Sequence, residues 1–237
     1  MKKPRKTNLF FANLLRQKGL YVGLLSALAV SQTSFAQENP LWMRYPSISP
    51  DGQTIVFSHK GDLYKVPAAG GTAVPLTLHE GHDYMPVWSK DGKQIAFASD
   101  RYGNFDVFVM PATGGEPKRL TYFSGNDFPS DFSADNQNII FRSGRRYTHT
   151  NSQFPRMAQL YSVPVAGGHA KMLLDVQAEA AQYNSNSSKI VYHDWKGYED
   201  DWRKHHTSSV TRDVWVYDVA SQKYTQITTF NGEDRNP

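Results

Sequence analysis

One unit of about 40 residues recurs four times along this chain, and a repeat of that length limits the fold more than any other feature. Each copy opens with a turn rich in Ser, Asp, Asn and Gly, such as Ser89-Lys90-Asp91-Gly92. An apolar triplet follows each turn, and we interpret it as a strand buried on both faces. The triplets are Ile55-Val56-Phe57, Ile95-Ala96-Phe97, Ile139-Ile140-Phe141 and Ile190-Val191-Tyr192.

The second half of each unit has a fixed length. A strand with aromatic and β-branched residues leads into a glycine pair in three copies and into Ser221-Gln222 in the fourth, and glycine supplies the positive φ of a tight hairpin. The spacing from this strand to the last apolar residue is 13 in every copy (63 to 76, 107 to 120, 160 to 173, 214 to 227). The spacing from the triplet to this strand grows instead through 8, 12, 21 and 24, so the length variation lies in one loop. The glycine pairs are Gly70-Gly71, Gly114-Gly115 and Gly167-Gly168.

Four short strands in each unit predict an all-β fold, a β-propeller of four-stranded antiparallel blades. A helical solenoid of similar period would show an apolar rhythm of 3.6 residues, which the sequence lacks. The variable loops then share one face of the propeller, which we expect to be the recognition face. The expected blades span approximately 45–77, 83–121, 127–174 and 179–228.

The last residues, Asp234-Arg235-Asn236-Pro237, repeat the pattern of Asp83-Tyr84-Met85-Pro86, which precedes an earlier turn. We therefore expect a fifth blade to begin at 234. On this interpretation residues 37–237 are an incomplete propeller of about four blades, and the chain is a fragment of a longer protein.

The first 36 residues have the pattern of a signal peptide. Basic residues precede the apolar run 20–30, which is too short to span a bilayer of about 30 Å, and small residues at Ser34 and Ala36 suit cleavage before Gln37. Removal of this leader leaves 20 Lys and Arg against 22 Asp and Glu, so we expect no nucleic-acid partner. The chain has no Cys, which excludes disulfides and a lipid-bearing cysteine. We expect a periplasmic or secreted protein that has no membrane contact after cleavage.

The common local signatures of a serine nucleophile, Gly-x-Ser-x-Gly and Ser-x-x-Lys, are absent from the sequence, and no catalytic residue is predicted. His79-Glu80-Gly81-His82-Asp83 resembles a metal-binding cluster, but it lacks the helical frame of a zincin. We favour a solvated loop between blades here, and we expect neither a metal nor a cofactor.

Two segments on the recognition face are candidates for binding. Arg145 and Arg146 open the third variable loop, and adjacent guanidinium groups can hold a carboxylate, although the residues by themselves favour a solvated surface pair. The fourth loop, 195–206, mixes aromatic residues with both signs of charge. This composition suits either a subunit contact or an insertion packed on its own blade.

The repeat Trp88-Ser89-Lys90-Asp91-Gly92 with its later Gly114-Gly115 resembles the WD40-like repeats shared by TolB-type propellers and tricorn-like serine peptidases. The stretch Lys196-Gly197-Tyr198-Glu199-Asp200-Asp201-Trp202, continuing to Ser209, is similar to an insertion in the tricorn-like enzymes alone. The resemblance covers the chain after its leader. It implies the amino-terminal six-bladed propeller of a peptidase whose second propeller, PDZ-like domain and catalytic core lie outside this chain.

The resemblance also implies a role for the arginine pair, because tricorn-type enzymes anchor the substrate's carboxylate with a basic pair in this propeller. Arg145 and Arg146 form the only Arg-Arg pair after the leader. The partners implied are oligopeptide substrates and the remaining domains of the same protein, with homo-oligomerisation left open. Two other interpretations stay open: a TolB-like protein-binding propeller without catalysis, and the propeller of a prolyl-oligopeptidase-type enzyme.

Overall fold

The computed structural model describes residues 42–145, 158–196 and 210–237, which belong to one compact unit, Trp42–Pro237. This part of the chain is built entirely from β-strands and their connections, which confirms the all-β propeller class. Within it, no helix is long and apolar enough to cross a membrane.

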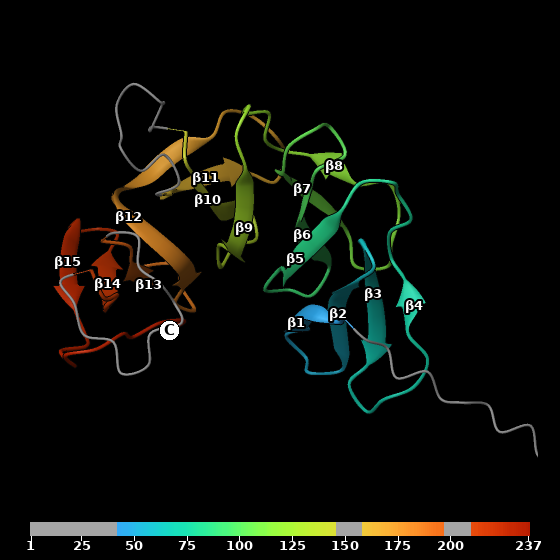
Figure 1. The fold of residues 1–237 in the computed structure, drawn as a ribbon, viewed down its shortest axis with the longest axis horizontal. Helices are drawn as coiled ribbons and strands as arrows, with labels where there is room; N and C mark the ends of the chain where they lie inside the picture. Colours follow the sequence, from blue (N-terminus) through green and yellow to red (C-terminus); the bar gives the residue numbers. More distant parts are fainter. Residues whose placement is uncertain (1–41, 146–157, 197–209) are drawn as a thin grey trace, which may run out of the picture. The chain divides into compact units, whose positions relative to one another are not determined.

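Two antiparallel sheets have the expected four strands each, in chain order (Figure 1). The first contains β1 (Arg44–Ile48), β2 (Thr54–His59), β3 (Asp62–Pro67) and β4 (Val74–Pro75). The second contains β5 (Asp83–Trp88), β6 (Gln94–Ser99), β7 (Asp106–Pro111) and β8 (Lys118–Arg119). In both, the predicted apolar triplet lies in the second strand.

The remaining strands form one sheet of seven, because the third and fourth units share a strand. Its long strand β12 serves both as the last strand of the third unit and as the first strand of the fourth. In the earlier units a loop that contains Gly81 or Gly125 separates these roles, whereas the stretch 173–178 has no glycine and continues as a strand. The strands are β9 (Asp127–Phe132), β10 (Asn138–Ser143), β11 (Gln159–Pro164), β12 (Lys171–Tyr183), β13 (Lys189–Asp194), β14 (Val214–Asp218) and β15 (Lys223–Gln226).

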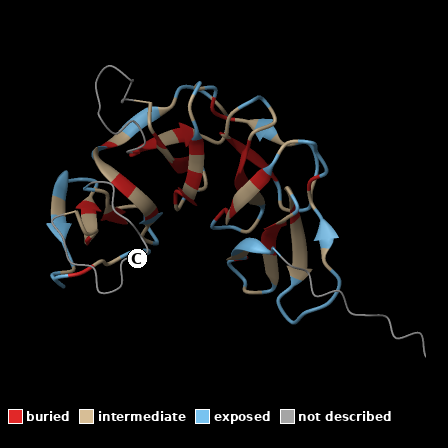
Figure 2. Cartoon of the chain, in the orientation of Figure 1, coloured by how far each residue is buried: buried red, intermediate tan, exposed pale blue. Residues whose placement is uncertain are grey.

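Adjacent units pack face to face, and this packing buries both faces of the central strands. Ile95 and Phe97 of β6 contribute to the apolar cluster with the first sheet, while Ala96 between them contributes to the cluster with the third unit. The side chains of β10 alternate in the same way. Figure 2 shows the result, with buried residues concentrated in the central strands and exposed residues at the edge strands such as β4 and β15.

The repeated turns are held by local hydrogen bonds that explain their sequence. Ser89 donates its hydroxyl to Asp91 at 2.7 Å, and the backbone N–H of Gln94 donates to the same hydroxyl at 2.9 Å. The Ser89 hydroxyl also holds the pKa of the Asp91 carboxyl below its usual range. The turns at Ser49 and Ser133 repeat these contacts, so a short polar motif sets the start of each triplet strand.

Asp131 of β9 joins three units. The ammonium of Lys90, in the second unit, contacts its two carboxylate oxygens at 2.7 and 2.8 Å. The backbone N–H of Tyr183, in the part of β12 that belongs to the fourth unit, donates to Asp131 at 2.8 Å. The carboxylate is buried, whereas Lys90 is partly exposed.

We predict that Asp131→Ala lowers the free energy of unfolding by about 2 to 4 kcal/mol, because it leaves the Tyr183 N–H and the Lys90 ammonium without their acceptor. Asp131→Asn, which keeps one acceptor oxygen, should cost less. Urea unfolding of the full chain measures both, with the exposed Glu116→Ala as the control. Equal stability of Asp131→Ala and the control would contradict this role for Asp131.

Candidate functional site

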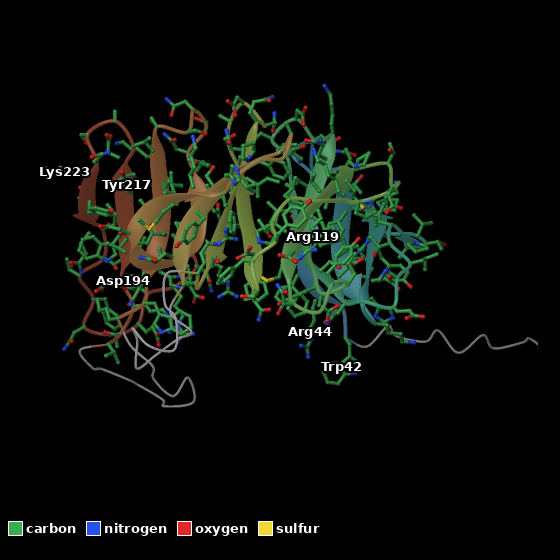
Figure 3. The ribbon with its side chains drawn as sticks, turned by 90° about the horizontal axis from the view of Figure 1, so that it is seen from above. Trp42, Arg44, Arg119, Asp194, Tyr217 and Lys223 are labelled. Atoms are coloured by element: carbon green, nitrogen blue, oxygen red, sulfur yellow. The ribbon has the colours of Figure 1, made fainter. Side chains whose placement is uncertain are left out.

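The connections between the second and third strands of each unit open at one end of the strands, which we call the loop face. The labelled side chains in Figure 3 show the two ends: Trp42, Arg44 and Asp194 lie toward the loop face, and Lys223 lies toward the opposite end. The candidate binding residues predicted from the sequence belong to the loop face.

On the loop face, a buried aspartate at the start of β5 is paired with an arginine that follows β6. The guanidinium of Arg101 donates to both carboxylate oxygens of Asp83, at 2.8 and 3.0 Å, and its Nε donates to the Ser99 hydroxyl at 2.9 Å. The same guanidinium lies 4.9 Å from the ring centre of Phe108. Arg101 therefore acts as a structural clamp between the first and second strands of its sheet.

Arg145 occupies the equivalent position one unit later. Its Nε donates to the Ser143 hydroxyl at 3.0 Å, and its Nη2 donates to Asp127, which is fully buried. Burial raises the pKa of Asp127, against the lowering effect of the Arg145 charge and of nearby hydroxyls. The Arg145 guanidinium also lies 5.1 to 5.2 Å from three aromatic ring centres, those of Phe123, Phe141 and Tyr161.

Of the arginine pair predicted from the sequence, the structure describes only Arg145. Arg145 already holds a carboxylate of its own chain, while Arg146 lies outside the described residues. Most of the loop 195–206 also lies outside them. Of its described residues, Lys196 forms ion pairs with Asp213 and Asp194, and the ring of Trp195 lies under the guanidinium of Arg212 at 5.0 Å.

The His79–Asp83 segment forms a loop between the first and second sheets. His79 accepts a hydrogen bond from the Gly81 N–H at 2.8 Å through Nδ1, and Asp83 forms an ion pair with Arg101. Within residues 42–145, 158–196 and 210–237, no three His, Asp or Glu side chains are placed to hold a metal ion.

A second feature is an opening of about 530 Å³ between the first strands of the units, which we call the axial opening. Its wall includes residues 45–47 of β1, 85–87 of β5, 129–130 of β9 and 179–182 of β12. The first strands of successive units contact one another, so the opening lies on the side of the sheets opposite the exposed edge strands β4, β8 and β15.

Three ionisable residues in the wall of the axial opening form one cluster. Arg142 of β10 forms an ion pair with Glu179 of β12, and the Nε2 of His193 lies 3.7 Å from the other Glu179 oxygen. The Asn236 N–H donates to His193 Nδ1 at 3.2 Å, which places the imidazole proton on Nε2, facing Glu179. Burial opposes ionisation of Glu179, but the nearby His193 imidazole and the charge of Arg142 outweigh it and lower the pKa of this carboxyl.

Sequence reasoning missed this cluster, although the repeat contained a signal for it. Arg142 and His193 both occupy the position directly after the apolar triplet, where the first two units have Ser58 and Ala98. Charged or ionisable residues at an otherwise small, buried repeat position indicate a polar wall. Aligning the repeats at that position would have identified both residues.

The fold and these two polar surfaces define the chain as part of a propeller with a loop face and an axial opening. The chain matches the model of the tricorn protease N-terminal β-propeller domain over residues 40–237, and it belongs to this family. None of the curated proteins compared with the sequence matches it.

Solved structures with the same fold include TolB proteins and tricorn protease. A putative TolB from Agrobacterium tumefaciens is 24% identical with a TM-score of 0.60, and the match covers 81% of this chain and 69% of that one. TolB from Acinetobacter baumannii is 20% identical with a TM-score of 0.61, over 81% of this chain and 45% of that one. The tricorn protease is 21% identical with a TM-score of 0.62, over 81% of this chain and 18% of that one. The chain thus spans less than half of the Acinetobacter TolB and about a fifth of tricorn protease.

We predict that Glu179→Gln is more destabilising at pH 7 than at pH 3.5. The pKa of Glu179 lies below its usual value near 4.5, so its charge stabilises the fold above that value and the stabilisation is lost as the pH falls through the folded-state pKa. Urea unfolding of both proteins at the two pH values measures the difference, with Glu116→Gln as the exposed control. A stability difference that does not shrink in acid would contradict the assignment.

Proposed function

We propose that this chain is the amino-terminal propeller part of an exported tricorn-like serine peptidase, in which it guides oligopeptides toward a catalytic domain. The family match over residues 40–237 carries the proposal. The chain itself then supplies recognition, and the nucleophile belongs to another part of the protein.

Two features of the described residues support a guiding role. The loop face has connections of increasing length on a rigid scaffold, an arrangement on which binding residues are commonly placed. The axial opening has a polar wall with a cation, an anion and an imidazole, which can hydrogen-bond a peptide backbone without favouring one side chain.

Arg146 is the member of the arginine pair that we propose contacts the substrate carboxylate, because Arg145 is already paired with Asp127. In the full peptidase, Arg146→Ala should lower kcat/KM about tenfold for oligopeptides with a free terminal carboxylate and leave their amidated forms unaffected. Fluorogenic peptides measure this, with Lys93→Ala, at an exposed site in a repeated turn, as the matched control.

Arg145→Ala should act mainly on stability, because it leaves the buried Asp127 unpaired. Unchanged cleavage by the Arg146→Ala variant would refute the substrate-binding role of the pair. Arg145 would then be a structural residue and Arg146 a surface residue. Absence of peptidase activity from the intact protein would remove the peptidase proposal altogether.

A TolB-like protein-binding propeller is the second candidate, because the TolB structures match the chain as well as tricorn protease does, with TM-scores of 0.60 to 0.62. This alternative requires no catalytic domain. The length of the protein expressed from the native gene separates the two, since only the peptidase proposal requires a long carboxyl-terminal extension.

Export by the leader 1–36 is part of the proposal, and the family match that begins at residue 40 supports it. The intact mass of the protein recovered from the periplasm or medium should correspond to a chain that starts at Gln37. Replacing Ala36 with a bulky residue should cause precursor to accumulate. A mature protein that retains Met1 would contradict export with cleavage.

A further inference from the structure

The loop face contains a further pocket, between the first and second sheets. It is distinct from the arginine pair and from the axial opening. It has a volume of about 430 Å³, within the range of small-ligand sites. Its residues come from the start of β1, the β2–β3 turn, and the segments that enter β5 and β7. The lining residues are Trp42, Arg44, Tyr45, Ser58, His59, Lys60, Gly61, His82, Tyr84 and Phe105.

The charged residues that line this pocket are all positive. Arg44 and Lys60 contribute two cations, and no lining residue is acidic. The acidic residues next to lining residues in the sequence are already engaged: Asp62 accepts from the Thr77 hydroxyl at 3.3 Å, while Asp83 and Asp106 form ion pairs with Arg101 and Arg119. Asp100, further along the chain, accepts from the His82 N–H at 2.6 Å. An anion in the pocket would therefore meet positive charge without a competing carboxylate on its walls.

The β2–β3 turn fixes the position of the lysine. Lys60 and Gly61 have φ values of 52° and 97°, as the central residues of a two-residue hairpin turn with positive φ at both positions require. A lysine with positive φ is uncommon, and asparagine adopts this conformation more readily. The turn thus accepts a lysine that its backbone geometry does not favour.

Two polar groups in the pocket lack partners within the described part of the chain. Ser58 is 4% exposed, and its hydroxyl has no hydrogen-bond partner there; the same holds for the buried Nδ1 of His59. A buried hydroxyl without a partner is destabilising, so such groups are rare unless something else satisfies them. Both residues line the cationic pocket, where an oxygen of a bound anion would accept a hydrogen bond from the Ser58 hydroxyl.

The remaining wall is aromatic. Tyr84 contacts Tyr45, Phe105 and His82 with ring-centre distances of 5.3, 4.7 and 5.1 Å. Burial raises the pKa of Tyr84 further above its ordinary value, to about 12, and its neutral phenol adds no negative charge to the wall. Next to the rings, the Arg44 guanidinium lies 5.1 Å from the ring centre of the exposed Trp42 (Figure 3).

We propose that this pocket binds a peptide carboxylate that lies next to an aromatic or large apolar side chain. The carboxylate pairs with Arg44 and Lys60 and accepts from Ser58, while the apolar side chain packs on the tyrosine and phenylalanine rings. The inference rests on the proposed function for its choice of a peptide, and it adds a second recognition point separate from Arg145 and Arg146. The carboxylate has two sources, the peptide terminus or a Glu or Asp side chain.

Binding of three labelled peptides of equal length to the full chain, measured by fluorescence anisotropy, tests the proposal and separates these sources. The first ends in Phe with a free carboxylate, the second is its amide, and the third is an amide with Glu beside the Phe. We expect the amide without Glu to bind about tenfold more weakly than the better of the other two. Equal binding of all three would overturn the proposal.

The variants Arg44→Gln and Lys60→Asn remove the cations, and the second keeps a residue suited to the turn. Their combination should weaken binding of the preferred peptide about tenfold, whereas Lys223→Gln, at the opposite end of the strands, should have no effect (Figure 3). Ser58→Ala should weaken binding about threefold and leave the unfolding midpoint unchanged or higher, because it removes an unpaired buried hydroxyl. A merely structural serine would show the reverse pattern.

The outcomes separate this inference from the proposed function. Carboxylate-dependent binding without cleavage by the intact protein would sustain the pocket and refute the peptidase. Cleavage that is unaffected by the Arg44 and Lys60 variants, with no carboxylate preference in binding, would refute the pocket alone. Tighter binding of an acidic sugar oligomer than of any peptide would overturn the choice of ligand, since stacked rings and cations also suit uronic acids.

Discussion

One backbone hydrogen bond joins each repeat unit to the next, and the arrangement of the sheets depends on it. The first residue of an inner strand donates its N–H to the carbonyl that precedes the third strand of the previous unit: Asp83 to Gly61 and Asp127 to Phe105, both at 2.7 Å. The N–H groups of Ala178, within β12, and of Asp234 donate in the same way to the carbonyls of Ala158 and Arg212. Because the bond involves only the backbone, it tolerates different side chains at every position, and it places each first-strand residue on the loop face.

The fold was predictable because it depends on sequence patterns within each repeat unit. Apolar triplets such as Ile95-Ala96-Phe97 are buried on both faces only if sheets pack on either side, and the serine-aspartate turns set where each triplet strand begins. The fixed spacing of 13 residues accompanies a repeated turn, which contains positive-φ glycines such as Gly114 and Gly115 in three units and Ser221-Gln222 in the fourth. None of these inferences needed a contact between residues far apart in the sequence.

The candidate sites were less accessible because they depend on long-range partners. Arg145 looked available for a ligand, but its partner Asp127 lies 18 residues earlier, at the start of another strand. The pairing of Arg142 with Glu179 and the cationic pocket around Ser58 combine different units, whose side-chain contacts no local pattern specifies. The repeat alignment carried part of this information, at the single position after each triplet.

The long strand β12 gives the third and fourth units a connection that the other junctions lack. Its 13 residues run from the last strand of one unit to the first strand of the next, with a bulge at Ala180, whose φ is 48°. At the other junctions a loop connects the two sheets, whereas here the same strand pairs with β11 of one unit and with β13 of the next. Glu179 of this shared strand contacts Arg142 of the third unit and His193 of the fourth, so the wall of the axial opening is built on the junction of these two units.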